Sequence, residues 1–279
     1  MDGSNNKVPA GLARAGAERV LWVAVGRQRV GKTTLLSAAA QFFRARGAEL
    51  EVWNADQQNR GHALSAFFPD AQTVPEGGVE DARRWIEERL QGLAELGAPG
   101  VGAVLDSGGG LTGFSRLVED VAFEETLDVF GIRPVGLFVV GPEDADLDYL
   151  EHFAAEGRFL PTASVVVLNE GLVLSGRAPQ IAFEPVLRHR AVQAAVGRGA
   201  RVVFFPPLGC LAGVARLRMT YPAILTADYA RVRAELGLFD LARVRRFWER
   251  DLPEFFAMIP SEWLPRGAVS AGGVQREAV

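Results

Sequence analysis

Lysine is almost absent from this chain of 279 residues. The 30 basic side chains comprise Lys7, Lys32 and 28 arginines. Cysteine is scarcer still, because Cys210 stands alone, and this excludes an intrachain disulfide and a cysteine-rich metal site. A single cysteine suits a reducing compartment, so we expect a cytoplasmic protein.

Long apolar runs are missing as well. No stretch approaches the roughly eighteen apolar residues of a transmembrane helix, so we expect no membrane partner. Residues 1–16 are polar and small, without the apolar core of a signal peptide, and we predict a flexible arm there. The apolar content of 48% is nevertheless enough for a sizeable core, which predicts a globular protein.

The charged side chains are segregated along the sequence. Residues 76–156 carry eighteen acids and five arginines, whereas residues 185–250 carry twelve arginines and four acids. A basic segment folded onto one face could hold a polyanion, so non-specific DNA is a candidate partner of residues 185–250. Solvated helix faces produce the same pattern, and the sequence leaves both interpretations open.

One of the two lysines lies in a phosphate-binding motif. The pattern G-x-x-x-x-G-K-[ST] follows an apolar, strand-like stretch and precedes an alanine-rich helical one, which is the context of a Walker A P-loop. Glycines let backbone N–H groups turn toward an anion, and the helix N-terminus adds positive charge. The nine residues of this candidate ATP site are Gly26, Arg27, Gln28, Arg29, Val30, Gly31, Lys32, Thr33 and Thr34.

Short β-rich runs alternate with helix-length stretches along the chain. This alternation predicts an α/β fold: a doubly wound, mostly parallel sheet with helices on both faces. The expected strands are Arg19 to Gly26, Glu49 to Asn54, Gly102 to Asp106, Pro134 to Gly141, Ser164 to Asn169 and Arg201 to Pro206. The expected helices include Thr33 to Arg46, Val79 to Leu96 and a last helical region, Leu238 to Met258, packed back on the sheet.

The sequence shows no internal repeat and no low-complexity linker in its middle. We therefore expect one P-loop ATPase domain over residues 17–259, followed by a flexible tail over residues 260–279.

Polar residues follow several predicted strands at the edge where ligands gather in a parallel sheet. Asp56 follows the second strand and could orient an attacking water. Asp106 closes the third strand before a glycine run, as a Walker B aspartate that holds Mg²⁺ does. The alternatives are a turn residue at 56 and a structural aspartate at 106.

Two further strand ends could flank a nucleotide base. Asn169 could hydrogen-bond the adenine edge, with the backbone around Pro207 on the other side of the ring; ordinary strand-end turns would look alike. The chain lacks the Asn-Lys-x-Asp sequence that reads guanine, so ATP is favoured over GTP.

Taken in order, these motifs resemble the ParA/MinD family of deviant Walker A P-loop ATPases. The resemblance spans Val20 to about Leu208, and the layout is most similar to the branch encoded on conjugative and mobilisable plasmids. It implies a slow Mg²⁺-dependent ATPase that acts in DNA partition, transfer or positioning. It also implies an ATP-dependent homodimer and a partner protein.

The resemblance assigns roles to individual residues. Lys32 would bind the β- and γ-phosphates, Thr33 would ligate Mg²⁺, Thr34 would support the α-phosphate, and Asp56 would position the hydrolytic water. Asp106 would hold Mg²⁺, through water.

Position 27 departs from the family pattern. Arg27 stands where the family has its signature lysine, a catalytic group that reaches the partner's nucleotide, and Gln28 and Arg29 replace two glycines. A guanidinium has the charge and the reach, but its planar fork differs from an ammonium.

Two other functions are compatible with the sequence. One is a P-loop ATP-dependent small-molecule ligase of the dethiobiotin-synthetase kind, and the other is an ATP-binding scaffold with little hydrolysis. A second cluster of polar residues that would specify a small substrate is not evident from the sequence.

Overall fold

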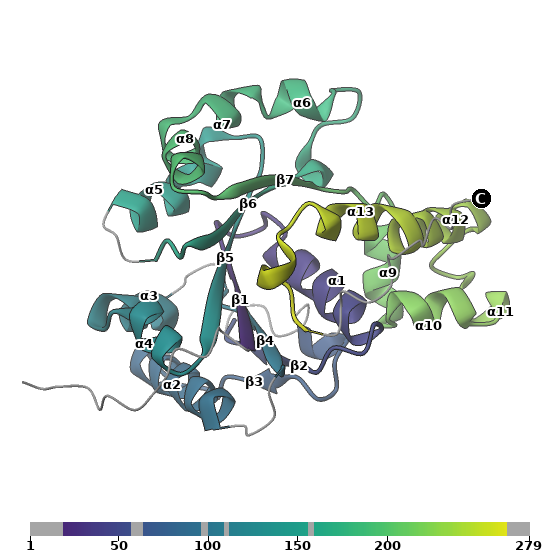
Figure 1. Cartoon of the computed structure of the whole chain (residues 1–279). Coiled ribbons are helices and arrows are strands. Elements are labelled where there is room, and N and C mark those ends of the chain that lie inside the picture. Colours follow the sequence, from purple (N-terminus) through teal and green to yellow (C-terminus); the bar gives the residue numbers. More distant parts are fainter. Residues whose placement is uncertain (1–18, 57–63, 96–99, 109–111, 156–158, 267–279) are drawn as a thin grey trace, which may run out of the picture.

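A computed structural model describes residues 19–56, 64–95, 100–108, 112–155 and 159–266 (Figure 1). Seven strands form one sheet in the order β3-β2-β4-β1-β5-β6-β7, and every neighbouring pair is parallel. The strands are β1 Arg19–Val25, β2 Leu50–Asn54, β3 Gln72–Thr73, β4 Gly102–Asp106, β5 Ile132–Val140, β6 Ala163–Asn169 and β7 Arg201–Phe205. The predicted fold class is confirmed; β3 was missed, because two residues are too few to show a period.

Helices cover both faces of the sheet (Figure 1). One face carries α1 Lys32–Arg44, α9 Leu211–Leu217, α10 Tyr221–Thr226, α11 Tyr229–Val232, α12 Leu238–Arg246 and α13 Leu252–Ala257. The other face carries α2 Val79–Glu95, α3 Thr112–Asp120, α4 Phe123–Val129, α5 Asp148–Ala155, α6 Pro179–Ala182, α7 Glu184–Arg188 and α8 Arg190–Gly197. Short 3₁₀ turns lie at Leu64–Ala66, Asp144–Leu147, Glu170–Leu172 and Ser261–Trp263.

Strand β1 lies in the middle of the sheet and is buried on both sides. Its alternate side chains enter the two cores: Trp22 packs with α1 and the C-terminal helices, and Val23 packs with the helices of the other face. Burial on both faces explains why this strand reads as a continuous apolar run.

The last helical region runs as predicted and packs back on the sheet. Helix α12 continues through one π-helical turn, Phe247–Asp251, into α13. Phe256 of α13 contacts Trp22 and Phe43, with ring centroids 6.0 Å and 4.8 Å away. These aromatic contacts fix the C-terminal helices over α1.

Residues 260–266 were assigned to a loose tail from the sequence, but they pack against the N-terminal edge of the sheet. The Trp22 indole N–H donates to the Trp263 carbonyl at 2.7 Å, and Arg133 donates to the Glu262 carbonyl. Pro265 is buried. The predicted arm and the rest of the predicted tail lie outside the described residues.

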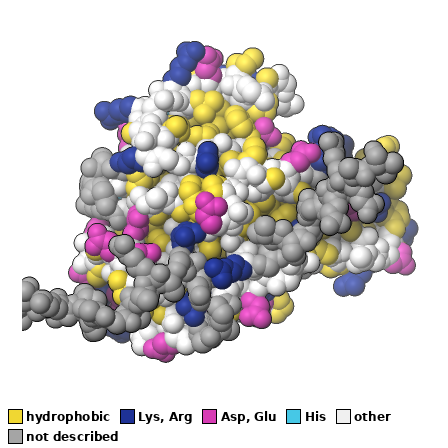
Figure 2. Space-filling model, viewed as in Figure 1, with side chains coloured by type: hydrophobic (Ala, Val, Ile, Leu, Met, Phe, Trp, Pro, Cys, Tyr) yellow, Lys and Arg dark blue, Asp and Glu magenta, His cyan; other side chains and the backbone are white. Residues whose placement is uncertain are grey.

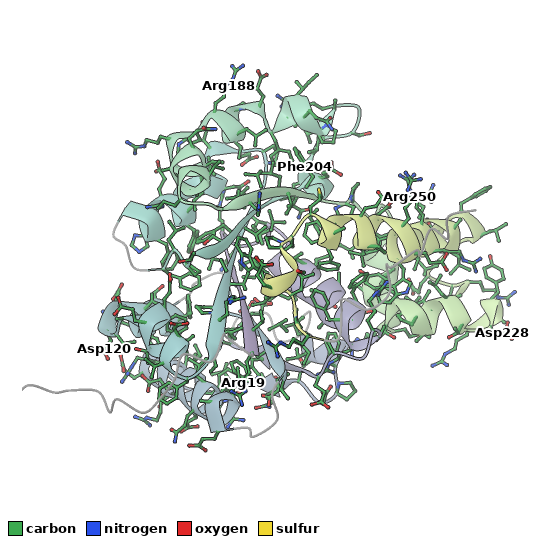
Figure 3. All side chains as sticks on the ribbon, in the orientation of Figure 1. Arg19, Asp120, Arg188, Phe204, Asp228 and Arg250 are labelled. Carbon is green, nitrogen blue, oxygen red and sulfur yellow. The ribbon has the colours of Figure 1, made fainter. Side chains whose placement is uncertain are left out.

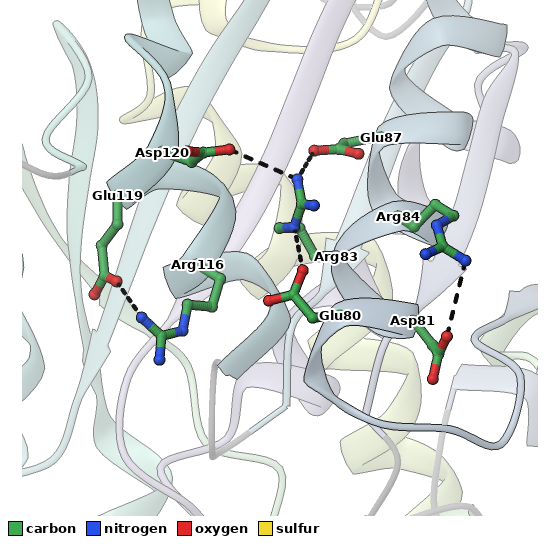
Figure 4. Close-up of polar contacts among 8 residues, drawn as sticks. All are labelled: Glu80, Asp81, Arg83, Arg84, Glu87, Arg116, Glu119 and Asp120. Carbon is green, nitrogen blue, oxygen red and sulfur yellow. Dashed lines mark hydrogen bonds and ion pairs between the residues drawn. The ribbon is translucent and has the colours of Figure 1, made fainter.

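Helices α2 and α3 are joined at the surface by charged side chains (Figure 4). Arg83 of α2 pairs with Glu80 and Glu87 on its own helix and reaches Asp120 of α3 at 3.7 Å. Part of the acidic segment is thus neutralised locally. Among the described residues, no helix is both long enough and apolar enough to cross a membrane.

The packing of residues 260–266 predicts a stability difference between two truncated chains. A chain that ends at Ile259 loses the Trp22 hydrogen bond, the partial burial of Trp263 and the burial of Pro265, so it should be less stable by about 2–4 kcal/mol than a chain that ends at Arg266. Urea unfolding followed by tryptophan fluorescence measures the difference. Equal midpoints and slopes would contradict the packing role.

Candidate nucleotide-binding site

The loop between β1 and α1 requires its two motif glycines. Gly26 has φ +151°, and a Cβ added there would lie 2.4 Å from the Val139 carbonyl oxygen. Gly31 has φ +101°, and its Cβ would lie 2.3 Å from the Asn169 amide nitrogen. Both positions combine a left-handed backbone with a close approach, so only glycine fits them. The spacing of these two glycines therefore corresponds to the geometry of the turn.

The first turn of α1 is available to an anion. The helix begins at Lys32 after Gly31, with no side chain capping its N-terminus and no acid in the first turn. Backbone N–H groups of a first turn lack intrahelical partners and carry the positive end of the helix dipole. A phosphate group would satisfy them.

Lys32 folds over its own loop. Its Nζ donates to the carbonyl oxygens of Gly26 and Arg27, each at 2.8 Å, and the residue is only 6% exposed. Burial lowers the pKa of Lys32, while the carboxylates of Asp106 and Asp56 oppose that shift. The ammonium is therefore held between the loop and two acids.

Thr33, in the first turn of α1, directly contacts Asp106, the last residue of β4. The Thr33 hydroxyl donates to Oδ2 of Asp106 at 2.5 Å, and the Gly108 N–H donates to Oδ1 at 3.2 Å. Asp106 is 1% exposed, and this burial raises its pKa. A hydroxyl beside a carboxylate is the oxygen donor set that Mg²⁺ uses next to phosphates.

Asp56 joins this group from β2. The Ala55 N–H donates to the Asp106 carbonyl at 2.8 Å, which places the end of β2 beside the end of β4. Gly108 has φ +73°, and a Cβ there would lie 3.0 Å from the Asp56 carboxyl carbon. The structure thus brings Lys32, Thr33, Asp56 and Asp106 to one edge of the sheet. Residues 57–59 and Gly109 and Gly110, the polar and glycine runs after these strands, lie outside the described residues.

A cavity of about 930 Å³ opens over these groups. Among the residues of the loop, Gln28, Arg29, Gly31, Lys32, Thr33 and Thr34 line it. Arg29 has φ +65°, the left-handed conformation at a non-glycine residue. Val30 also belongs to the loop, but it is buried. Arg27 is not among the lining residues, because its side chain turns toward Asp146.

Asn169, at the end of β6, is hydrogen-bonded to the loop between β1 and α1. Its Nδ2 donates to the Val30 carbonyl at 2.7 Å, and its Oδ1 accepts the Gly171 N–H at 3.0 Å. The amide has one further N–H, so contact with an adenine edge stays a prediction. Pro207 is exposed and lines a separate hollow of about 370 Å³ beside Glu170 and Phe204, not the cavity over Lys32.

The cavity also includes residues that sequence reasoning missed. It continues along α1 past Ser37 and Gln41 to Tyr221, where Gln41 Oε1 accepts the Tyr221 N–H at 2.7 Å. Polar residues recur at positions 33, 37 and 41 of an alanine-rich helix. Because residues four apart share one face of a helix, this pattern indicates a polar stripe along α1 that could have been found from the sequence. The opposite wall comes from far along the chain: Leu211, Ala212, Val214, Ala215, Arg216, Arg218 and Glu235.

No family model matches the chain, and no curated protein matches it. Among solved structures, the chain is similar to the MinD cell division protein of Aquifex aeolicus, with 15% identity over 83% of this chain and 97% of that one, at a TM-score of 0.45. The MinC:MinD cell division protein complex of the same organism gives 13% identity over 83% and 96%, at a TM-score of 0.41.

The buried carboxylate of Asp106 predicts a gain of stability when its charge is removed. A folded-state pKa above the ordinary value means that the folded protein loses stability as pH rises through the interval between the two values. Asp106→Asn should therefore be more stable at pH 7, by about 1 kcal/mol or about 3 °C for a domain of this size.

Thermal unfolding at pH 7 measures this gain, with Asp128→Asn as the control, because Asp128 is exposed at the opposite end of the sheet. A lower melting temperature for Asp106→Asn alone would show that the carboxylate stabilises the unliganded fold.

Proposed function

We propose that this protein is a Mg²⁺-dependent ATP-binding protein and slow ATPase of the ParA/MinD type, acting as a nucleotide switch. The observation that carries the proposal is the uncapped first turn of α1 beside Lys32, Thr33 and Asp106. Plasmid or DNA partition, transfer or positioning is the setting that the resemblance of the motifs suggests. The partner protein is unidentified.

The residues fit a nucleotide with its metal. First-turn amides and Lys32 would hold the β- and γ-phosphates, and Thr34 would support the α-phosphate. Thr33 would ligate Mg²⁺ directly and Asp106 through water, and the ion would neutralise charge that develops on the phosphates. Lys32 would exchange its two carbonyl partners for phosphate oxygens.

We propose that Asp56 positions the attacking water. It lies at the cavity edge beside Gly108, on the same side as Asp106, where its carboxylate could accept a hydrogen bond from an attacking water. Hydrolysis would then depend on positioning and on charge stabilisation, with ADP and phosphate as products.

DNA binding through residues 185–250 stays a prediction. Six of the twelve arginines pair with acids, and Arg188 and Arg250 lie in different parts of the molecule (Figure 3). On the face in Figure 2, basic side chains are scattered among acidic and neutral ones. The other six arginines of this segment have no ion pair within the described residues: Arg198, Arg201, Arg218, Arg231, Arg233 and Arg245.

A small-molecule ligase is the second candidate, favoured by the continuation of the cavity past Ser37 and Gln41. Arg218 is exposed at the end of α9, has no ion pair among the described residues, and could bind a carboxylate substrate there. ATP turnover that requires an added carboxylic acid would favour this candidate over the switch.

Two substitutions test the proposal. Lys32→Ala should weaken Mg²⁺-ATP binding by about a hundredfold or more, because the phosphates lose the Lys32 ammonium. Asp56→Ala should bind Mg²⁺-ATP within about threefold of wild type but lose hydrolysis. Titration calorimetry measures binding, and phosphate release measures turnover.

Asp128→Ala is the matched control, an exposed acid at the other end of the sheet, and should leave both quantities unchanged. ATPase activity retained in Asp56→Ala would remove the water-positioning role. Undetectable ATP binding by the folded wild type would overturn the proposed function, and binding without turnover would favour the scaffold.

A further inference from the structure

Arg27 belongs to the phosphate-binding loop, but its side chain leaves the cavity. Its carbonyl oxygen accepts a hydrogen bond from Lys32, so its backbone is part of the loop. Its guanidinium lies beside the turn after β5: Nη1 is 3.6 Å from Oδ1 of Asp146 and 3.9 Å from Oε2 of Glu143. The neighbouring residues Gln28 and Arg29 line the cavity instead.

Asp146 is the fixed member of this ion pair. The residue is 6% exposed, and a Cβ added at Gly141 would lie 2.3 Å from its Oδ2, so the carboxylate fills the space that this glycine leaves. Among the described residues, Arg27 is the one cation that pairs with Asp146. The Arg27 side chain is 49% exposed and is therefore free to move.

Two anions compete for one guanidinium in this arrangement. The loop holds the Arg27 backbone beside the phosphate site, so the side chain can turn either to Asp146 or toward a bound nucleotide. A guanidinium makes charge-assisted hydrogen bonds with carboxylate and phosphate alike. While it pairs with Asp146, its charge does not contribute to phosphate binding.

We propose that Asp146, assisted by Glu143, is a positioning residue that holds Arg27 away from the nucleotide and thereby lowers the affinity for ATP. The inference rests on the proposed function, because it assumes that the cavity binds a nucleoside triphosphate. A partner that displaces the turn after β5 would release Arg27 toward the phosphates.

The test is a double-mutant cycle on Mg²⁺-ATP binding, measured by titration calorimetry. Asp146→Asn keeps the shape of the side chain and removes its charge, so it should tighten binding by about three- to tenfold. In the Arg27→Ala background, the same substitution should change binding by less than about twofold. Asp144→Asn is the matched control, because Asp144 is an exposed acid in the same turn without an ion pair among the described residues.

The outcomes separate the inference from the proposed function. If the wild type binds Mg²⁺-ATP but Asp146→Asn binds no more tightly, or if the gain persists without Arg27, the positioning role is overturned and the function stands. If neither the wild type nor Asp144→Asn binds Mg²⁺-ATP, the proposed function is overturned and the inference with it.

Arg27→Ala alone keeps the inference testable should Asp146→Asn fail to fold, since Arg27 is half exposed and its loss should not disturb folding. Because Asp146 already holds the guanidinium, its removal should weaken ATP binding by less than about threefold. A loss of tenfold or more would show that Arg27 faces the phosphates in the wild type and would overturn the proposal.

Discussion

The structure depends on the tight turn that leads from β1 into α1. Strand β1 is buried on both faces, so the chain must leave the sheet within a few residues and start a helix that packs on one side. Gly26 approaches the Val139 carbonyl oxygen and Gly31 approaches Asn169, so two neighbouring strands shape the turn. Because the turn ends without a capping side chain, the positive end of α1 is left to an external anion.

Buried charged side chains lie close together at the carboxyl ends of the strands beside this turn, although their burial does not stabilise the fold. Asp106 is almost fully buried with a raised pKa, and Lys32 is buried with a lowered pKa, although the two charges attract each other. Buried charges that lower the stability of the folded protein in this way are expected where ligand binding requires them. Bound Mg²⁺ would compensate the negative charge of Asp106, and bound phosphate would compensate the positive charge of Lys32. Ligand binding would therefore stabilise this edge of the sheet.

The sheet could be predicted from the sequence because the parallel strands are buried on both faces and read as apolar runs. The tight turn between β1 and α1 could be predicted because the spacing of Gly26 and Gly31 reflects local backbone geometry; phosphate binding by this turn stays a prediction. The sequence did not predict what distant contacts decide. The direction of Arg27 depends on Asp146, the tie between Asn169 and Val30 depends on the approach of β6, and the packing of Trp263 depends on the indole of Trp22. The partners of these side chains are distant in the sequence and come together only in the folded chain.

The most direct test of a nucleotide switch is the molar mass in solution, measured by light scattering without nucleotide, with Mg²⁺-ADP and with Mg²⁺-ATP. The account predicts a monomer of 30.1 kDa without nucleotide and with ADP, and twice that mass with ATP alone. A mass that stays the same in all three states, with ATP binding demonstrated on the same sample, would contradict it.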